Sequence, residues 1–205
     1  MVLPSKMDVF FPLSPFLFDA AGCAMLAAAS ALRARHASCP PVGAGVLGVL
    51  CGLAAPLLRA ALAGQPAFLV LDTPPYSAFI CGGAALGAVL GRFGWTEGRF
   101  WSLLDAAGLQ LLACSGVLVV QGLPLSPPGI LLFAGVTAFA PGLIRDIAIG
   151  DTAALADEPA YAAAPLLGIL LTLGCLLLFW PSLTALAAGW GVGFLARALV
   201  VLQQK

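Results

Sequence analysis

The stretch Leu17-Phe18-Asp19-Ala20-Ala21-Gly22 returns later in the chain as Leu103-Leu104-Asp105-Ala106-Ala107-Gly108, at an offset of 86 positions (105 − 19 = 86). The same offset places Arg59 over Arg145 and Gly64 over Gly150. Residues 17–64 align without a gap on residues 103–150, with 14 identities in 48 positions. An apolar composition produces chance matches of alanine and leucine, but it does not align Asp, Arg and Gly at one offset. The chain therefore contains an internal repeat.

Composition indicates that lipid surrounds most of this chain. Hydrophobic residues make up 61% of its 205 residues, charged residues 9%, and the mean hydropathy is +1.06. A soluble domain carries about 25% charged residues, so the charges here are too few to cover a water-facing surface. The formal net charge is zero, which argues against nucleic acid as a partner.

Seven apolar stretches are long enough to cross a bilayer, which needs about 20 apolar residues in a helix. Most of the prolines and more than half of the charged residues fall outside them. The stretches are continuously apolar, whereas the strands of a membrane barrel alternate. We therefore expect one all-α transmembrane domain over residues 1–205, with residues 1–15 as a short extramembrane segment and no cleaved signal. The predicted helices are 16–34, 42–63, 76–93, 101–121, 128–150, 161–181 and 183–203.

Because each repeat contains three helices, an odd number, the second copy enters the membrane from the opposite side. Repeat 1 covers about 16–93 and repeat 2 about 101–181, and the last helix, about 183–203, lies outside them. This is an inverted repeat of three plus three helices with an extra C-terminal helix. Basic residues concentrate on one side of the predicted topology, and the side rich in Lys and Arg is normally cytoplasmic. We expect an outer N-terminus and a cytoplasmic C-terminus. The basic residues on that side are Arg33, Arg35, Arg92, Arg99 and Lys205.

The second helix of each repeat is predicted to be broken, with a kink, at a proline well inside its apolar run, Pro56 in one and Pro141 in the other. Proline removes a backbone donor and frees the carbonyl four residues earlier, here those of Gly52 and Thr137. In a membrane such carbonyls must face protein or a wet cavity, where they can bind cations. An ordinary kink with satisfied carbonyls is the alternative. The predicted pore-lining residues are Gly52, Ala54, Ala55, Pro56, Thr137, Ala140, Pro141 and Gly142.

Charged residues inside the predicted spans form matching pairs. Asp19 and Arg59 are separated by 40 residues, and so are Asp105 and Arg145. Charges in membranes are rare and usually pair in the interior, so we predict two related ion pairs. Adjacent Arg145 and Asp146 should not face each other. A helix-capping role for Asp19, and a capping box formed by Ser102 and Asp105, are the alternatives.

Small residues crowd the third and seventh helices. They include Gly82, Gly83 and Gly87 in the third helix and Gly189 to Gly193 in the seventh. Small residues allow helix backbones to approach closely. We expect these faces to make helix–helix contacts, within one subunit or between subunits.

Together these motifs resemble the trimeric intracellular cation (TRIC) channel family, including its bacterial members, over about residues 16–200. The better match is Pro141-Gly142-Leu143-Ile144-Arg145-Asp146, followed by Gly150 and the segment 159–161. The first copy differs, because Ala60 replaces the acid after Arg59. The resemblance implies a homotrimer with one pore in each subunit, built around the second helix of each repeat. It also implies a potassium channel in a bacterial inner membrane.

Three kinds of function are compatible with a membrane protein of this design. The first is a monovalent cation channel, with K⁺ as the permeant ion and Na⁺ as the second candidate, and with no cofactor. The second is a secondary transporter of a small neutral solute such as glycine, since inverted repeats are also a transporter design. Few polar groups in the spans favour the simple pore. The third is an intramembrane aspartyl protease, which needs two carboxylates at close range. Asp19 and Asp105 are expected near opposite faces, so we expect no enzyme.

Overall fold

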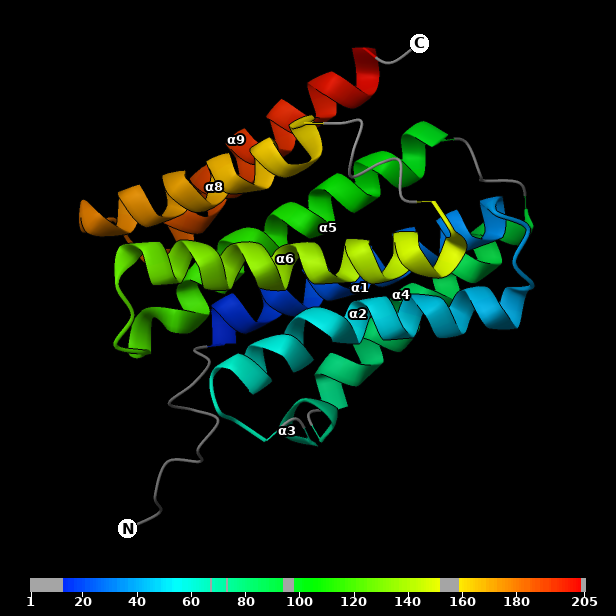
Figure 1. Cartoon of the computed structure of the whole chain (residues 1–205), viewed down its shortest axis with the longest axis horizontal. Helices are drawn as coiled ribbons and strands as arrows, with labels where there is room; N and C mark the ends of the chain where they lie inside the picture. The colour runs from blue at the N-terminus through cyan, green and yellow to red at the C-terminus, as the bar shows by residue number, and fades with distance from the viewer. Residues whose placement is uncertain (1–12, 67, 73, 94–97, 152–158, 204–205) are drawn as a thin grey trace.

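The computed structural model describes the chain except for residues 1–12, 67, 73, 94–97, 152–158 and 204–205. Within the described residues the fold consists of helices, and seven of them are long (Figure 1). A four-residue helix α3 (Phe68–Leu71) precedes α4, and a 3-10 turn η1 (Val120–Gly122) follows α5. The predicted all-α membrane fold is confirmed. The long helices are α1 (Leu13–His36), α2 (Pro41–Leu62), α4 (Pro74–Arg92), α5 (Gly98–Val119), α6 (Pro127–Ile149), α8 (Pro159–Leu177) and α9 (Ser182–Gln203).

Five of the long helices are apolar and long enough to cross a membrane: α1, α2, α5, α6 and α9. The remaining two, α4 and α8, carry shorter apolar segments, Tyr76–Arg92 and Ala162–Leu177. Helix α4 packs against α1 and α2, and α8 packs against α9 and α5. The third helix of each repeat therefore lies against the first helix of its own repeat, as a shared three-helix unit requires.

The same turn ends the second helix of both repeats. Gly64 and Gly150 have φ angles of 67° and 74°, in the left-handed region that glycine adopts without a steric cost. In each case the next residue donates its backbone N–H to the carbonyl five positions back, Gln65 to Ala60 and Asp151 to Asp146. These are the hydrogen bonds of a Schellman turn. Residues that are 86 positions apart in the sequence therefore form the same backbone turn.

Helices α1 and α5 cross where the repeated Asp-Ala-Ala-Gly motif ends. A Cβ atom added to Gly22 would lie 3.3 Å from the carbonyl oxygen of Gly108, and one added to Gly108 would lie 3.0 Å from the carbonyl oxygen of Gly22. The two glycines are repeat counterparts, so each contacts its own equivalent. This reciprocal contact marks the pseudo-two-fold axis of the inverted repeat.

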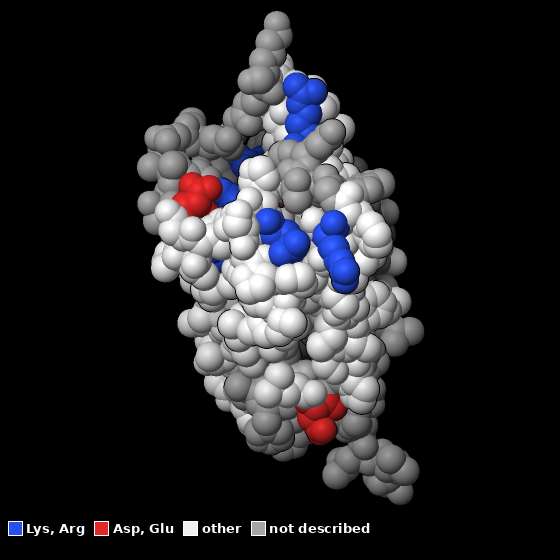
Figure 2. Space-filling model, turned by 90° about the vertical axis from the view of Figure 1, so that its right-hand side faces the viewer, with Lys and Arg blue, Asp and Glu red and all other residues white. Residues whose placement is uncertain are grey.

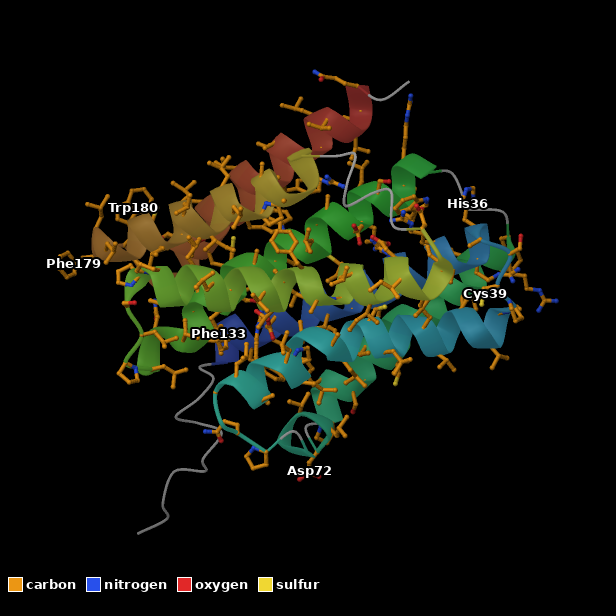
Figure 3. All side chains as sticks on the ribbon, viewed as in Figure 1. His36, Cys39, Asp72, Phe133, Phe179 and Trp180 are labelled. Atoms are coloured by element: carbon orange, nitrogen blue, oxygen red, sulfur yellow. The ribbon has the colours of Figure 1, made fainter. Side chains whose placement is uncertain are left out.

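Predicted helix ends differ from the observed ones by up to four residues. Helix α1 begins at Leu13, so residues 13–15 are helical although they were expected outside the membrane; the rest of that segment lies outside the described residues. Helix α8 ends at Leu177 rather than 181. The helix ends in a turn in which the backbone N–H of Trp180 donates to the backbone carbonyl of Cys175, and Phe179 has a positive φ of 61°. Phe179 and Trp180 lie at the end of the bundle opposite His36 and Cys39 (Figure 3).

Glycines on α4 allow it to pack directly on the backbone of α1. A Cβ atom on Gly83 would lie 2.3 Å from the carbonyl oxygen of Ala24, and one on Gly87 would lie 2.3 Å from that of Ala28. On α9, Cβ atoms at Gly189 and Gly193 would collide with side chains of the subunit's own α8 and α5. Gly83, Gly87, Gly189 and Gly193 therefore make helix–helix contacts within one subunit.

We expect Gly87→Ala to destabilise the fold by about 1–3 kcal/mol, because the methyl group would overpack the contact with α1. Gly82 on the same helix has no atom within 4 Å of an added Cβ, so Gly82→Ala is the matched control and should be neutral or slightly stabilising. Thermal unfolding in detergent measures both. Equal melting temperatures for the two variants would contradict the close α1–α4 contact.

Candidate functional site: two buried ionic clusters

A salt bridge joins Asp19 of α1 to Arg59 of α2 in the interior of the bundle. Asp19 is 1% exposed and Arg59 is 3% exposed. The helices place the two charges together because Asp19 lies near the beginning of α1 and Arg59 near the end of α2, and the two helices are antiparallel neighbours. The first predicted ion pair is therefore present.

Further polar groups complete this first cluster. The hydroxyl groups of Tyr76 on α4 and Ser115 on α5 both donate to the Asp19 carboxylate. Arg59 donates from Nη2 to the backbone carbonyl of Leu112 on α5 and from Nε to Oγ1 of Thr137 on α6, the latter over 3.3 Å. Buried charges are stable only when they are paired and hydrogen-bonded. Arg59 thus connects both halves of the inverted repeat.

The second cluster lies at the other end of the bundle and contains the counterparts of the first pair. Arg145 of α6 forms a salt bridge with Asp105 of α5, which is the second predicted ion pair. Arg145 and Asp146 are 0% exposed and Asp105 is 2% exposed. Both acids and the arginine are therefore held in a part of the bundle that water does not reach.

One feature of the second cluster contradicts the expectation from helix geometry. Nε of Arg145 lies 2.8 Å from Oδ1 of the adjacent Asp146, although neighbouring residues on a helix point in different directions. The prediction that they would not face each other is wrong. The long arginine side chain bends back to the acid because both groups are buried, and an unpaired charge would cost far more than the bend.

Arg33 of α1 joins the second cluster from another helix. Its Nη1 lies 3.1 Å from Oδ1 of Asp146, and its Nη2 lies 2.6 Å from Oδ2 of Asp151. Its guanidinium carbon also lies 4.6 Å from the centre of the Trp101 ring. The Asp151 side chain is 47% exposed, so this cluster extends from the dry interior to the surface.

The capping interpretation of the aspartates is wrong. Asp19 lies six residues after the start of α1, and Asp105 lies seven residues after the start of α5. Neither first turn contains an acidic residue. Ser102 is also within α5, so it cannot cap the helix. Both helices begin earlier than their apolar pattern suggested, and this moves the acids into the interior.

The prolines do not interrupt their helices. Pro56 lies inside α2 and Pro141 inside α6, both are buried, and each helix continues through its proline. Neither helix is therefore divided into two at its proline, and a bend of each helix at that point stays a prediction. A proline removes only one hydrogen bond of the ladder, and the packed neighbours hold the remaining turns. Cation binding at the carbonyls of Gly52 and Thr137 stays a prediction.

The remaining predicted pore residues divide between interior and intermediate positions. Gly52 packs against α1 and α4, where an added Cβ would lie 2.8 Å from Cγ2 of Ile80. Thr137 is 0% exposed and touches Arg59. Ala54 and Ala140 are partly exposed, whereas Ala55 and Gly142 are buried. Of the predicted pore-lining residues, Thr137 is the one whose side chain accepts a hydrogen bond from an ionic cluster, from Nε of Arg59.

The two aspartates of the repeated motif do not share a site. Asp19 accepts a hydrogen bond from Ser115, which lies ten residues beyond Asp105 on α5, or about 15 Å along the helix axis. An aspartyl-protease pair requires two carboxylates that share one proton. The geometry of Asp19 and Asp105 does not provide this.

Sequence reasoning missed Tyr76, Arg33 and Asp151 as members of the clusters. Tyr76 had a detectable signal, because the only other tyrosine, Tyr161, follows it by 85 residues near the start of the third helix of repeat 2. Arg33 was used only as evidence of orientation. Asp151 follows the left-handed Gly150, and no repeat pattern identified it because position 65 is glutamine.

Comparison with solved structures finds the same architecture. A TRIC channel orthologue from Rhodobacter sphaeroides has a TM-score of 0.85 and 25% identity, and the match covers 93% of this chain and 98% of that one. A prokaryotic TRIC channel crystallised in 0.5 M KCl has a TM-score of 0.82 and 20% identity, over 93% of this chain and 96% of the other.

Sequence comparisons match shorter parts of the chain. A family model described as glycine transporter matches residues 102–176, which is repeat 2. A UPF0126 membrane protein from Vibrio cholerae serotype O1 is 44% identical over 50 residues. That stretch is 24% of this chain and spans only 21% of the length of that curated relative.

The fold and the paired ionic clusters define an integral membrane protein built from an inverted repeat of three plus three helices and one extra helix. The resemblance predicted from the two motifs is confirmed by the structural match. By its fold, the chain is similar to the bacterial TRIC channels of known structure.

We expect Asp19→Asn to lower the free energy of unfolding by about 3–5 kcal/mol, because it leaves Arg59 as an uncompensated buried charge. The double variant Asp19→Asn/Arg59→Gln should recover part of this loss. Denaturant titration in detergent measures the free energy of unfolding of the parent, of both single variants and of the double variant. Asp72 is exposed, so Asp72→Asn is the control and should change little. Strictly additive losses in the double variant would show that the two side chains do not interact energetically.

Proposed function

We propose that this protein is a cation channel that conducts monovalent ions, with K⁺ as the main permeant ion. The observation that supports it best is the pair of ionic clusters, one in each repeat, on the helices that surround the centre of the bundle. Similarity over nearly the whole length to a structure described as a cation channel adds support. The pore of each subunit would follow α2 and α6.

Arg59 is the residue through which such a pore would be closed. Its guanidinium contacts α1, α5 and α6 from its position on α2, and so it crosses the interface between the repeats. A permeant cation cannot approach an arginine held there, since like charges repel strongly in a low-dielectric interior. Conduction would therefore require the Arg59 side chain to leave its contacts with Leu112 and Thr137.

The carbonyls of Gly52 and Thr137 are the proposed ligands for the ion in the open pore. Each precedes a buried proline by four residues and so lacks its usual helical donor. Carbonyl oxygens replace the water ligands of a permeating ion in this way. Because Arg59 touches Thr137, the bound cation and the arginine would occupy the same region alternately.

Assembly as a homotrimer is part of this proposal. It is supported by the structural relatives, one of which is described as a trimeric intracellular cation channel. Each subunit would contain its own pore, since both ionic clusters lie within one chain. Membrane lipid would be the only other partner.

A bacterial inner membrane, with the N-terminus outside and the C-terminus in the cytoplasm, is the proposed location. Arg35, Arg92 and Arg99 gather at one end of the bundle, and basic side chains are visible there in Figure 2. The positive side normally faces the cytoplasm. Green fluorescent protein fused to the C-terminus should fluoresce in bacterial cells, because it matures in the cytoplasm. A dark fusion protein that is nevertheless present in the membrane would reverse the orientation.

The family model described as glycine transporter favours a second function, uptake of glycine or a similar small solute. Its match covers α5, α6 and most of α8. A zwitterion could bind at either cluster, with its carboxylate at the arginine and its ammonium at the aspartate of that cluster. The two functions differ in whether ions pass without the solute.

Planar bilayer recording under a potassium gradient tests the channel directly. The purified parent should give discrete cation-selective openings. Arg145→Ala and Pro141→Ala should alter conductance or open probability, because one removes the partner of Asp105 and the other restores a backbone donor. Gly82→Ala, on an open face of α4, is the control and should behave like the parent. Silence in the bilayer, with labelled glycine accumulating in matched vesicles, would replace the channel with the transporter.

A further inference from the structure

An apolar groove runs along the outside of the bundle between α2 and α4. It is open to the surroundings and has a volume of about 350 Å³. One side is formed by α2 residues spaced as one helical face, and Ala84 of α4 lies at its floor, 1% exposed. The lining residues include Val42, Gly45, Val46 and Val49 of α2 and Cys81 and Ala84 of α4.

The groove opens toward the end of the bundle that carries the basic residues. Val42 is the second residue of α2 and is 80% exposed. Arg92 is the last residue of α4, and it lies seven residues beyond the groove residue Ala85, or about 10 Å along the helix axis. The apolar surface and the positive charge are therefore continuous along one face.

Arg35 is held at the same mouth by two contacts. Its Nη1 donates over 2.6 Å to the carbonyl oxygen of Cys39, just before α2. Its aliphatic stem lies on the last turn of α4, where a Cβ atom on Gly91 would be 2.7 Å from Cβ and Cγ of Arg35. Neither Arg35 nor Arg92 forms a salt bridge with any residue that the structure describes.

We propose that this groove binds an anionic phospholipid, with one acyl chain lying along α2 and α4 and the phosphate at Arg35 and Arg92. The lining matches a hydrocarbon chain, because its side chains are apolar. The two arginines match a phosphate group, since they have no carboxylate partner among the described residues. Basic side chains at the cytoplasmic surface attract anionic lipid headgroups in this manner. An apolar surface of a second subunit would cover the groove but would bring no charge to the two arginines, which have no carboxylate partner in the part of the chain that the structure describes.

Native mass spectrometry of the full chain in detergent tests the proposed lipid site. Phosphatidylglycerol and phosphatidylcholine with identical acyl chains are added in equal amounts, and the spectra show which lipid stays bound. Two arginines predict a preference of about thirtyfold for phosphatidylglycerol. The double variant Arg35→Gln/Arg92→Gln should lose this preference and still retain phosphatidylcholine at the parent level. Arg99→Gln removes the same charge from α5 at the same end and should keep the preference. An unchanged preference in the double variant would overturn the assignment of the headgroup site.

A second pair of variants tests the groove itself. Added Cβ atoms at Gly45 and Gly82 both have open space around them, but only Gly45 lines the groove. Gly45→Leu should reduce retention of both lipids by filling the groove, and Gly82→Leu should not. The same spectra report the number of subunits. If Gly45→Leu changes that number and leaves lipid retention as in the parent, the groove is a contact between copies of this chain and the lipid proposal is wrong.

Discussion

Charge neutralisation without water is the constraint on which this bundle depends. Asp19, Asp105 and Asp146 are almost completely buried, and each has an arginine beside it. A carboxylate left alone at such a position would cost several kcal/mol, so the helices that carry the partners must stay together. Arg59 and Arg145 therefore determine how α1 meets α2 and how α5 meets α6. The apolar surfaces pack the helices together, and the ion pairs determine which arrangement of the helices forms.

The two clusters differ in how they are completed. In the first, hydroxyl groups of Tyr76 and Ser115 surround Asp19, so the cluster is closed within the interior. In the second, a further arginine and a half-exposed Asp151 extend the chain of charges to the surface. An inverted repeat thus carries one dry cluster and one that communicates with solvent. This difference gives the two ends of the proposed pore different responses to the surrounding ions.

Much of the fold was predictable because its strongest signals are local. Continuous apolar stretches predicted the seven long helices. The offset of 86 residues predicted the inverted repeat and both ion pairs. Exact helix starts were not predictable: α1 and α5 extend beyond their apolar cores, and this placed Asp19 and Asp105 deeper than their apparent position in a first turn. The contact between Arg145 and Asp146 also could not be read from helix geometry, since it depends on a flexible side chain and on burial. Arg33 and Tyr76 come from other helices, and only tertiary packing brings them to the clusters.

The contact between Gly22 and Gly108 constrains both halves of the chain at once. Each glycine lies against the backbone of its own repeat counterpart, so a larger side chain on either one would push the two halves apart. Positions away from the axis do not meet their counterparts in this way, and there the two copies can differ: Ala60 corresponds to Asp146, and Gln65 corresponds to Asp151. The inverted repeat therefore requires identical small residues only at the axis, which leaves the rest of each copy free to carry different chemistry.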